Sequence, residues 1–236
     1  MSRTQALIFD VFGTCVDWRG GIAMEAAKLF KDKEIGVDPH AFADAWRAEY
    51  QPAMERIRSG GRFYVDLDDL HRENLDRVLE RFELSPHFDD SERTDFARAW
   101  EKLPAWTDVA PGLELMRRRA IVAPCSNGSI ALMTRLARFA GLPWDCILGA
   151  GIARDYKPKP EVYLASCAAL RLAPDEVMMV AAHNSDLHAA HAAGLKTAFV
   201  PRPQEHGALQ TTDLGPTAAW DHVAENFEAL AAALFH

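Results

Sequence analysis

The chain has 236 residues, of which 49% are hydrophobic and 25% are charged, so it can bury a sizeable core as one large domain or as a core with an insert. Its formal net charge of -8 would repel a phosphate backbone, which argues against a general nucleic-acid-binding protein. The N-terminal residues lead straight into an apolar strand, and no run of about 18 apolar residues occurs, so we expect a cytoplasmic protein that does not interact with membranes.

The four cysteines are widely spaced and form no C-x-x-C pair. They are Cys15, Cys125, Cys146 and Cys167. Most of them sit inside apolar stretches, whereas a catalytic cysteine needs an accessible, electropositive setting. We therefore expect reduced thiols in the core.

The first predicted element is a short buried strand. Residues 6–9 form a continuous apolar run, as expected for a parallel strand covered on both faces. Asp10 follows at the carboxyl end, and Gly13 permits the tight turn that comes next. In open α/β sheets the reaction crevice lies just outside such strand ends, so Asp10 is a candidate for chemistry. The alternative is that Asp10 only stabilises a turn, which is common for Asp beside Gly.

A long helical segment follows the first strand. Apolar residues recur at three-to-four spacing in residues 22–30, 41–54 and 70–82. Asp38-Pro39 marks a helix start, and Ser59-Gly60-Gly61 marks a helix end. This pattern predicts an all-helical insert over residues 17–104.

From residue 107 onward, strands and helices alternate. Strands are predicted at 119–125, 146–149, 177–182 and 197–200, and helices at 129–140, 160–170 and 187–193. Repeated βα units imply a doubly wound parallel sheet with right-handed crossovers, and the first strand must join this sheet. We therefore expect an α/β fold in which residues 1–16 and 105–236 form the core and residues 17–104 form a helical cap.

Three further polar clusters follow predicted strands. Ser126 and Asn127 precede a helix, where unpaired N–H groups and the helix dipole favour an anion, although this cluster could be a plain N-cap. Lys157 lies in a loop stiffened by two prolines, and a solvated basic loop is the alternative, above all for Lys159. Asp186 begins a helix as a cap or pairs with Lys157. Together with the carboxylate after the first strand, these groups could hold a small anion in line for nucleophilic attack.

In these motifs the chain resembles the haloacid dehalogenase superfamily over essentially its full length. The matching motifs are FDVFGT at residues 9–14, Ser126-Asn127-Gly128, Tyr156-Lys157-Pro158 and the segment ending at Asp186. The resemblance implies a Rossmann-like catalytic core with a helical cap inserted after the first strand. It makes Asp10 a nucleophile.

Phe12 decides between the branches of that superfamily. In its phosphatases, the residue two places after the nucleophile is a second Asp that protonates the leaving group, which Phe12 cannot do. Those phosphatases also bind Mg²⁺ through further acids, but residues 181–186 contain one carboxylate here. We expect no metal and no cofactor. A Mg²⁺-dependent phosphatase remains the alternative, and a catalytically idle binding or dimerisation module is a second one.

The match is closest to the L-2-haloacid dehalogenases, which implies a role for each matching residue. It implies that Asp10 displaces halide from C2 of a short 2-haloacid and that water then hydrolyses the aspartyl ester. The resemblance also implies that Thr14 orients Asp10, that Lys157 keeps Asp10 anionic, and that Tyr163 belongs to the site. Ser126 and the backbone amides of Val11 and Phe12 would hold the substrate carboxylate. Arg47 would bind the departing halide, with Asn127 opposite. A solvated position on a cap helix is the alternative for Arg47. Among the aromatic residues Trp18, Trp46, Phe63 and Tyr64, we expect Trp46 to line the pocket and the others to pack.

The chain departs from the family pattern at Ala181 and His183, where many members carry Ser and Asn to hold the hydrolytic water. Our hypothesis is that His183 and Asp186 share this task, because a histidine near its neutral pKa can accept a proton. This form, together with residues 202–206, resembles a subgroup that accepts short haloacetates, including fluoroacetate. The family resemblance also predicts a homodimer.

Overall fold

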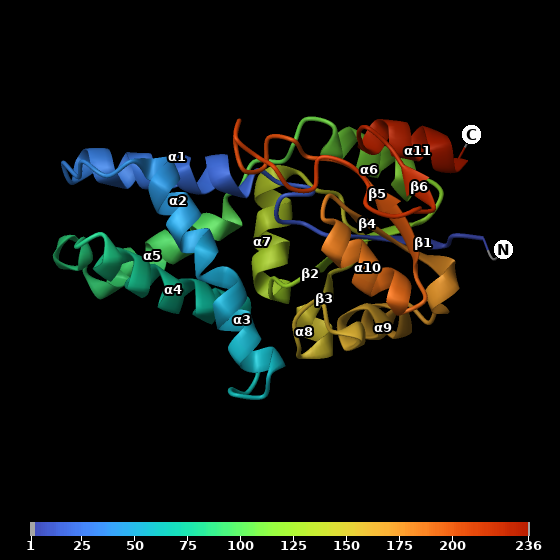
Figure 1. Cartoon of the computed structure of the whole chain (residues 1–236), viewed down its shortest axis with the longest axis horizontal. Helices are drawn as coiled ribbons and strands as arrows, with labels where there is room; N and C mark the ends of the chain where they lie inside the picture. Colours follow the sequence, from blue (N-terminus) through green and yellow to red (C-terminus); the bar gives the residue numbers. More distant parts are fainter. Residues whose placement is uncertain (1–2, 236) are drawn as a thin grey trace.

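The computed structural model describes residues 3–235. Within them, a six-stranded parallel sheet has the order β3-β2-β1-β4-β5-β6 (Figure 1). The strands are β1 (Ala6–Phe9), β2 (Ile121–Ser126), β3 (Leu148–Gly149), β4 (Val177–Ala181), β5 (Lys196–Phe199) and β6 (His222–Val223). Because β1 lies between β2 and β4, the residue that follows it stands at the centre of the sheet's carboxyl edge. The predicted doubly wound α/β fold is confirmed.

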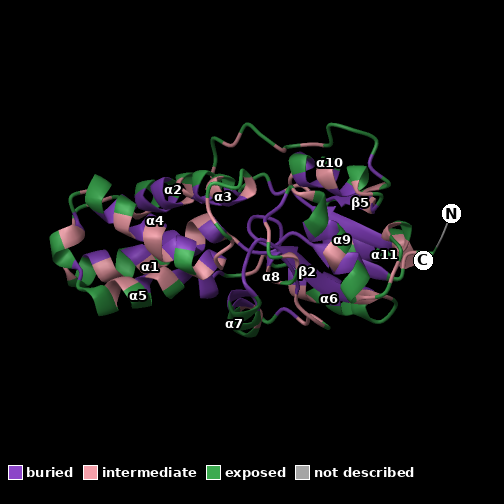
Figure 2. Cartoon of the chain, turned by 90° about the horizontal axis from the view of Figure 1, so that it is seen from below, coloured by how far each residue is buried: buried purple, intermediate pink, exposed green. Residues whose placement is uncertain are grey.

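Helices cover both faces of the sheet, which explains why its central strands are apolar along their whole length. Leu7 and Phe9 pack in the cluster that contains Phe227, on the side of α6 (Val109–Arg117) and α11 (Phe227–Phe235). Ala6 and Ile8 pack in a second cluster, on the side of α9 (Pro160–Ala169) and α10 (Asn184–Ala192). Figure 2 shows the buried residues gathered in the sheet and on the inward sides of the helices.

The helical segment lies beside the sheet rather than on it (Figure 1). Its helices are α1 (Trp18–Asp32), α2 (Pro39–Ala48), α3 (Tyr50–Arg58), α4 (Leu67–Arg81) and α5 (Asp90–Ala97), with 3-10 turns at Ser85–His87 and Arg98–Glu101. It has an aromatic core of its own, in which Phe42 stacks on Phe96 with ring centroids 5.5 Å apart. The two segments of chain that connect the helical segment to the core run side by side, since Val16 forms an antiparallel bridge with Ala105. The exact cap boundaries at residues 17 and 104 stay a prediction.

The expectation of one helix over residues 41–54 is wrong, since the chain breaks at Glu49 between α2 and α3. Pro52 explains the break. It lacks an N–H for the carbonyl of Ala48, and its ring would clash with that carbonyl in a continuous helix. Pro52 is tolerated in the first turn of α3, where no intrahelical N–H is required. The bend allows α3 to continue along the edge of the cavity described below.

Other boundaries moved by a few residues. Helix α7 (Ile130–Ala140) has the predicted start and stop, with Ser129 as N-cap and Gly141 in the left-handed conformation at φ +68°. Helix α10 begins at Asn184, three residues earlier than expected, and β3 has two residues rather than four. The pattern did not predict α6, α8 (Ala150–Ala153), β6 or α11. No helix in the described part of the chain is long and apolar enough to cross a membrane.

Candidate active site

A cavity of about 730 Å³ opens between the carboxyl edge of the sheet and the helical segment. Its core wall includes Asp10, Phe12, Asn127, Lys157, His183 and Asp186, and its helical wall includes Arg47, Tyr50, Gln51, Glu55 and Arg58. Of the predicted strand-end residues, Asp10, Asn127, Lys157 and Asp186 therefore do meet at one crevice, and the helical segment forms the opposite wall.

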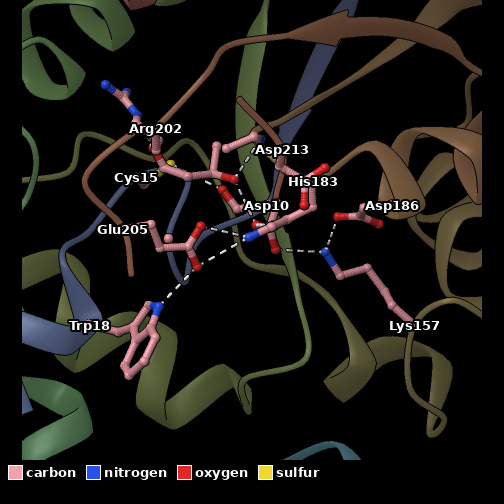
Figure 3. A network of polar contacts seen from close by, with 12 residues as sticks. Asp10, Cys15, Trp18, Lys157, His183, Asp186, Arg202, Glu205 and Asp213 are labelled. Carbon is pink, nitrogen blue, oxygen red and sulfur yellow. Dashed lines mark hydrogen bonds and ion pairs between the residues drawn. The ribbon is translucent and has the colours of Figure 1, made fainter. Parts of the chain in front are cut away.

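Asp10 lies at the centre of a hydrogen-bonded network (Figure 3). Its Oδ1 accepts from Lys157 Nζ at 2.8 Å, and its Oδ2 accepts from Thr14 Oγ1 at 2.7 Å. His183 Nδ1 is 3.0 Å from the same Oδ2. Burial opposes ionisation, but the charges of Lys157 and His183 outweigh it and hold the pKa of Asp10 well below its usual range. Asp10 is therefore an ionised carboxylate that is only 7% exposed.

Lys157 is aimed at Asp10 by a second carboxylate. Its Nζ also donates to Asp186 Oδ2, and the hydroxyl of Tyr163 donates to Asp186 Oδ1. The backbone N–H of Lys157 donates to Asn127 Oδ1 at 2.8 Å. Burial disfavours the ammonium, but Asp10 and Asp186 outweigh it and raise the pKa of Lys157. Asp186 thus anchors an ion pair with Lys157, one of the two alternatives open from the sequence.

His183 is paired with Glu205, a residue to which the sequence assigned no role. His183 Nε2 lies 2.9 Å from Glu205 Oε2 and 3.1 Å from Oε1. Burial lowers the pKa of His183, but Glu205 and Asp10 on its two sides outweigh that and raise it well above its usual value. The expectation that His183 works with Asp186 is not supported, because both Asp186 oxygens are taken by Lys157 and Tyr163. We call His183 and Glu205 the dyad below.

The loop that carries Glu205 is bound to the turn after the first strand through Arg202. Arg202 Nε donates to the backbone carbonyl of Thr14 at 2.8 Å, and its two terminal nitrogens bind Asp108 at 2.8 and 2.9 Å. Gly13 has φ +90°, and a Cβ there would come within 2.1 Å of Glu205 Oε1. Glycine at this position therefore meets two requirements: it adopts the positive φ of the turn, and it leaves room for the carboxylate.

Arg47 lies where the resemblance expects it, on the cavity wall, and not on a solvated face. Its guanidinium lies over the ring of Tyr50 at 4.1 Å and near that of Trp18 at 5.2 Å. Its Nη1 is buried and has no hydrogen-bond partner within residues 3–235. A buried guanidinium nitrogen without a partner is suited to an incoming anion. Tyr50, which the sequence reasoning missed, supports Arg47 from one turn further along the chain.

Some predicted residues lie elsewhere. The prediction that Trp46 lines the pocket is wrong. Its side chain is buried inside the helical segment, with 1% exposed, and its Nε1 donates to His71 O at 3.1 Å. Val11 and Ser126 are buried and do not line the cavity, and Ser126 Oγ accepts from Gly128 N. Phe63 does not pack as expected, since it is 95% exposed.

Lys159 and Tyr64 lie outside the network. Lys159 reaches the cavity rim and pairs with Asp155 at 2.9 Å, in keeping with a basic loop. Tyr64 packs beside Tyr156, with ring centroids 5.3 Å apart.

The groups around Asp10 do not suit Mg²⁺, which requires several hard oxygen ligands. Lys157 and His183 occupy its two carboxylate oxygens, and the ring of Phe12 stands where a second acid would be needed. Among residues 3–235, no group of three or more His, Cys, Asp or Glu could hold a metal ion. Residues and geometry together disfavour a metal-dependent phosphatase.

Comparison with known proteins agrees with this geometry. Residues 4–194 match the model of the haloacid dehalogenase-like hydrolases. Among curated proteins, (S)-2-haloacid dehalogenase 4A of Burkholderia cepacia is 27% identical over 228 residues, which cover 91% of this chain and 95% of that protein.

Two solved structures are more similar. The defluorinating L-2-haloacid dehalogenase Rha0230 is 50% identical with a TM-score of 0.96, and the alignment covers 98% of this chain and 95% of that one. The L-2-haloacid dehalogenase PA0810 is 41% identical with a TM-score of 0.93, covering 98% of both chains. With a nucleophile-like Asp10, a phenylalanine two places on and no fit for Mg²⁺, the chain belongs to the haloacid dehalogenase-like hydrolases and, among them, to the L-2-haloacid dehalogenases.

Proposed function

We propose that this protein hydrolyses short 2-haloalkanoic acids to 2-hydroxy acids through an aspartyl ester, without a metal. The observation that carries the proposal is the ionised carboxylate of Asp10, held by Lys157 and Thr14 on the cavity wall, with Phe12 in place of a second acid. A halide leaving group needs no proton, so the absence of an acid at position 12 does not impede this reaction.

In the first step, an oxygen of Asp10 attacks C2 of the substrate. The new C–O bond forms as the C–halogen bond breaks, and the halide leaves with the bonding electron pair. Displacement from the rear inverts C2 and gives an ester of Asp10. Lys157 keeps the carboxylate anionic before the attack, and Thr14 fixes its orientation.

Arg47 is the residue we assign to the departing halide. Its unpartnered Nη1 supplies a buried N–H donor, and Asn127 faces the same cavity from the core. For the substrate carboxylate, the family resemblance implies Ser126 and the backbone N–H groups of Val11 and Phe12. Of these three residues only Phe12 lines the cavity here, so we assign the carboxylate to its backbone N–H. Donors aimed at the charge that develops in the transition state are the largest single contribution in many enzymes.

In the second step, water attacks the acyl carbon of the ester, and the dyad takes its proton. Ester formation removes the negative charge of Asp10, so His183 loses one of the two anions that favour its imidazolium form. Its proton is then released more easily, and the neutral ring, oriented by Glu205, can accept a proton from water. Acyl–oxygen cleavage then frees the 2-hydroxy acid, whose departing oxygen takes the second proton of the attacking water, and Asp10 returns as a carboxylate beside the protonated His183.

The decisive experiment measures halide release from both enantiomers of 2-chloropropionate, from chloroacetate and from fluoroacetate, with and without EDTA. We expect release from the L enantiomer and from the acetates, with no effect of EDTA. Fluoroacetate is included because Rha0230, 50% identical to this chain, is described as defluorinating. Turnover that EDTA abolishes, or phosphate-ester hydrolysis alone, would support the phosphatase instead.

A single turnover in ¹⁸O-water tests the intermediate. Because water attacks the acyl carbon, the label should enter Asp10 and be found in its peptide by mass spectrometry. Label in the hydroxy acid alone would mean direct attack of water on C2. The predicted homodimer is checked separately, by light scattering during size-exclusion chromatography.

A further inference from the structure

Trp18, the first residue of α1, reaches from the helical segment to the dyad (Figure 3). Its ring is 1% exposed, and its Nε1 donates to Glu205 Oε1 at 2.9 Å. Glu205 belongs to the loop after β5, so this bond joins the two parts of the molecule at the catalytic centre. Trp18 was expected only to pack.

The bond fixes how Glu205 meets His183. Oε1 accepts from Trp18 Nε1 and lies 3.1 Å from His183 Nε2, while Oε2 lies 2.9 Å from the same His183 nitrogen. The carboxylate also lies close to Gly13, where a Cβ would come within 2.1 Å of Oε1, so it is held between the turn and the indole. The same indole ring lies 5.2 Å from the guanidinium of Arg47. Trp18 therefore stands between the group assigned to the halide and the base.

We propose that Trp18 is a positioning residue for ester hydrolysis. Its indole N–H orients Glu205 toward His183, so the geometry of the base depends on the position of the helical segment relative to the core. This inference rests on the proposed function. It predicts that Trp18→Phe affects one step only. Ester formation depends on Lys157 and Thr14, to which Trp18 makes no hydrogen bond in this network, and on Arg47, beside which phenylalanine keeps an aromatic ring.

The charges that face the dyad set the direction of a pH effect. His183 faces Asp10 and Glu205. Glu205 faces His183, the charge of Arg47, and His206, whose Nε2 lies 3.6 Å from Oε1. Removal of the indole donor leaves the Glu205 carboxylate less stabilised and a stronger proton acceptor for His183. The pKa of His183 should then rise, and hydrolysis of the ester should reach its full rate only at higher pH.

The test compares Trp18→Phe with Trp46→Phe, which removes another buried indole N–H of the helical segment that donates to a backbone carbonyl. Rapid-quench measurement with L-2-chloropropionate separates the first burst of chloride from steady-state turnover. For W18F we expect a burst rate within about twofold of the wild type, a steady-state rate about tenfold lower, and a pH profile moved to higher pH. W46F should match the wild type in all three.

Trp18→His keeps a ring N–H on a smaller ring and is the second variant. It should recover part of the steady-state rate that W18F loses, and it tests the proposal if W18F does not fold. A W18F enzyme with unchanged turnover, an equal loss of burst and turnover, or no recovery in W18H would overturn the role of Trp18. Failure of the wild type to release halide would instead refute the proposed function, so the two failures are distinct.

Discussion

The two walls of the cavity are built on different principles. On the core wall, Asp10, Lys157, Asp186 and His183 satisfy one another through short hydrogen bonds and ion pairs. On the helical wall, Arg47 keeps a buried nitrogen that has no hydrogen-bond partner among residues 3–235, and its guanidinium lies against the rings of Tyr50 and Trp18. Under the proposed function, this difference corresponds to a division of labour: the core wall would make and break the bonds to Asp10, and the helical wall would receive the leaving group.

The difference has a physical basis. A buried charge is tolerated when it is paired, so a network of alternating charges can stand ready before the substrate arrives. An unpaired guanidinium is less stable in the empty site and gains most when an anion arrives. Under the proposed function, the reacting groups therefore lie in the core, and the group with the greatest affinity for an anion lies in the helical segment.

The largest effect should come from the nucleophile. Asp10→Asn keeps the shape of the side chain but removes the charge, so halide release should fall on the order of 10⁴-fold, burst included. Asp155→Asn, which removes a carboxylate paired with Lys159 near the cavity rim, is the control and should stay near the wild-type rate. Halide electrodes or ion chromatography give the rates. If D10N kept its burst of halide, Asp10 would not be the nucleophile, and the core wall would not carry out the first step.

The next effect separates the two steps. His183→Ala should lower turnover about 10³-fold while the first equivalent of halide is still released, because only the ester lacks its base. The adduct on Asp10 should appear in the intact mass of the quenched protein. Loss of halide release with no trapped adduct would count against a base at position 183. His188→Ala, on the exposed side of α10, is the matched control.

A smaller effect is expected on the helical wall. Arg47→Met should slow the burst itself about 10²-fold, because the halide loses its charged donor in the transition state. Arg77→Met, in the same segment but near its surface, should leave the burst unchanged. Were R47M to lose turnover while its burst rate stayed normal, Arg47 would act on the ester and the division between the walls would fail.

The smallest effect is a difference in pH dependence. Asp10 has a lowered pKa and stays ionised in mild acid, so the burst should persist down to about pH 5. Turnover should decline as the pH falls, because a protonated His183 accepts no proton from water. Glu205 still faces His183 in the ester and favours its imidazolium form, so turnover should begin to decline at a pH where the burst still has its full rate. Stopped-flow and steady-state rates across the same buffers check this.

The sequence alone determined the core wall. Apolar strands followed by polar residues place Asp10, Asn127, Lys157 and Asp186 at one edge of a parallel sheet, since parallel strands end together. That argument depends on local pattern and on topology rules that leave few choices. Thr14 and Tyr163 were predicted from the family resemblance, and both lie in the network as expected.

Only the tertiary structure decided the rest. Trp46 and Arg47 are neighbours on one helix, and the packing of α2 determines that the ring enters the aromatic core while the guanidinium faces the cavity. Glu205 meets His183 and Trp18 because Arg202 draws its loop onto the turn at Thr14 and Gly13 makes room for the carboxylate. These contacts join residues far apart in the chain through irregular loops, where no periodic pattern records which side chains will meet.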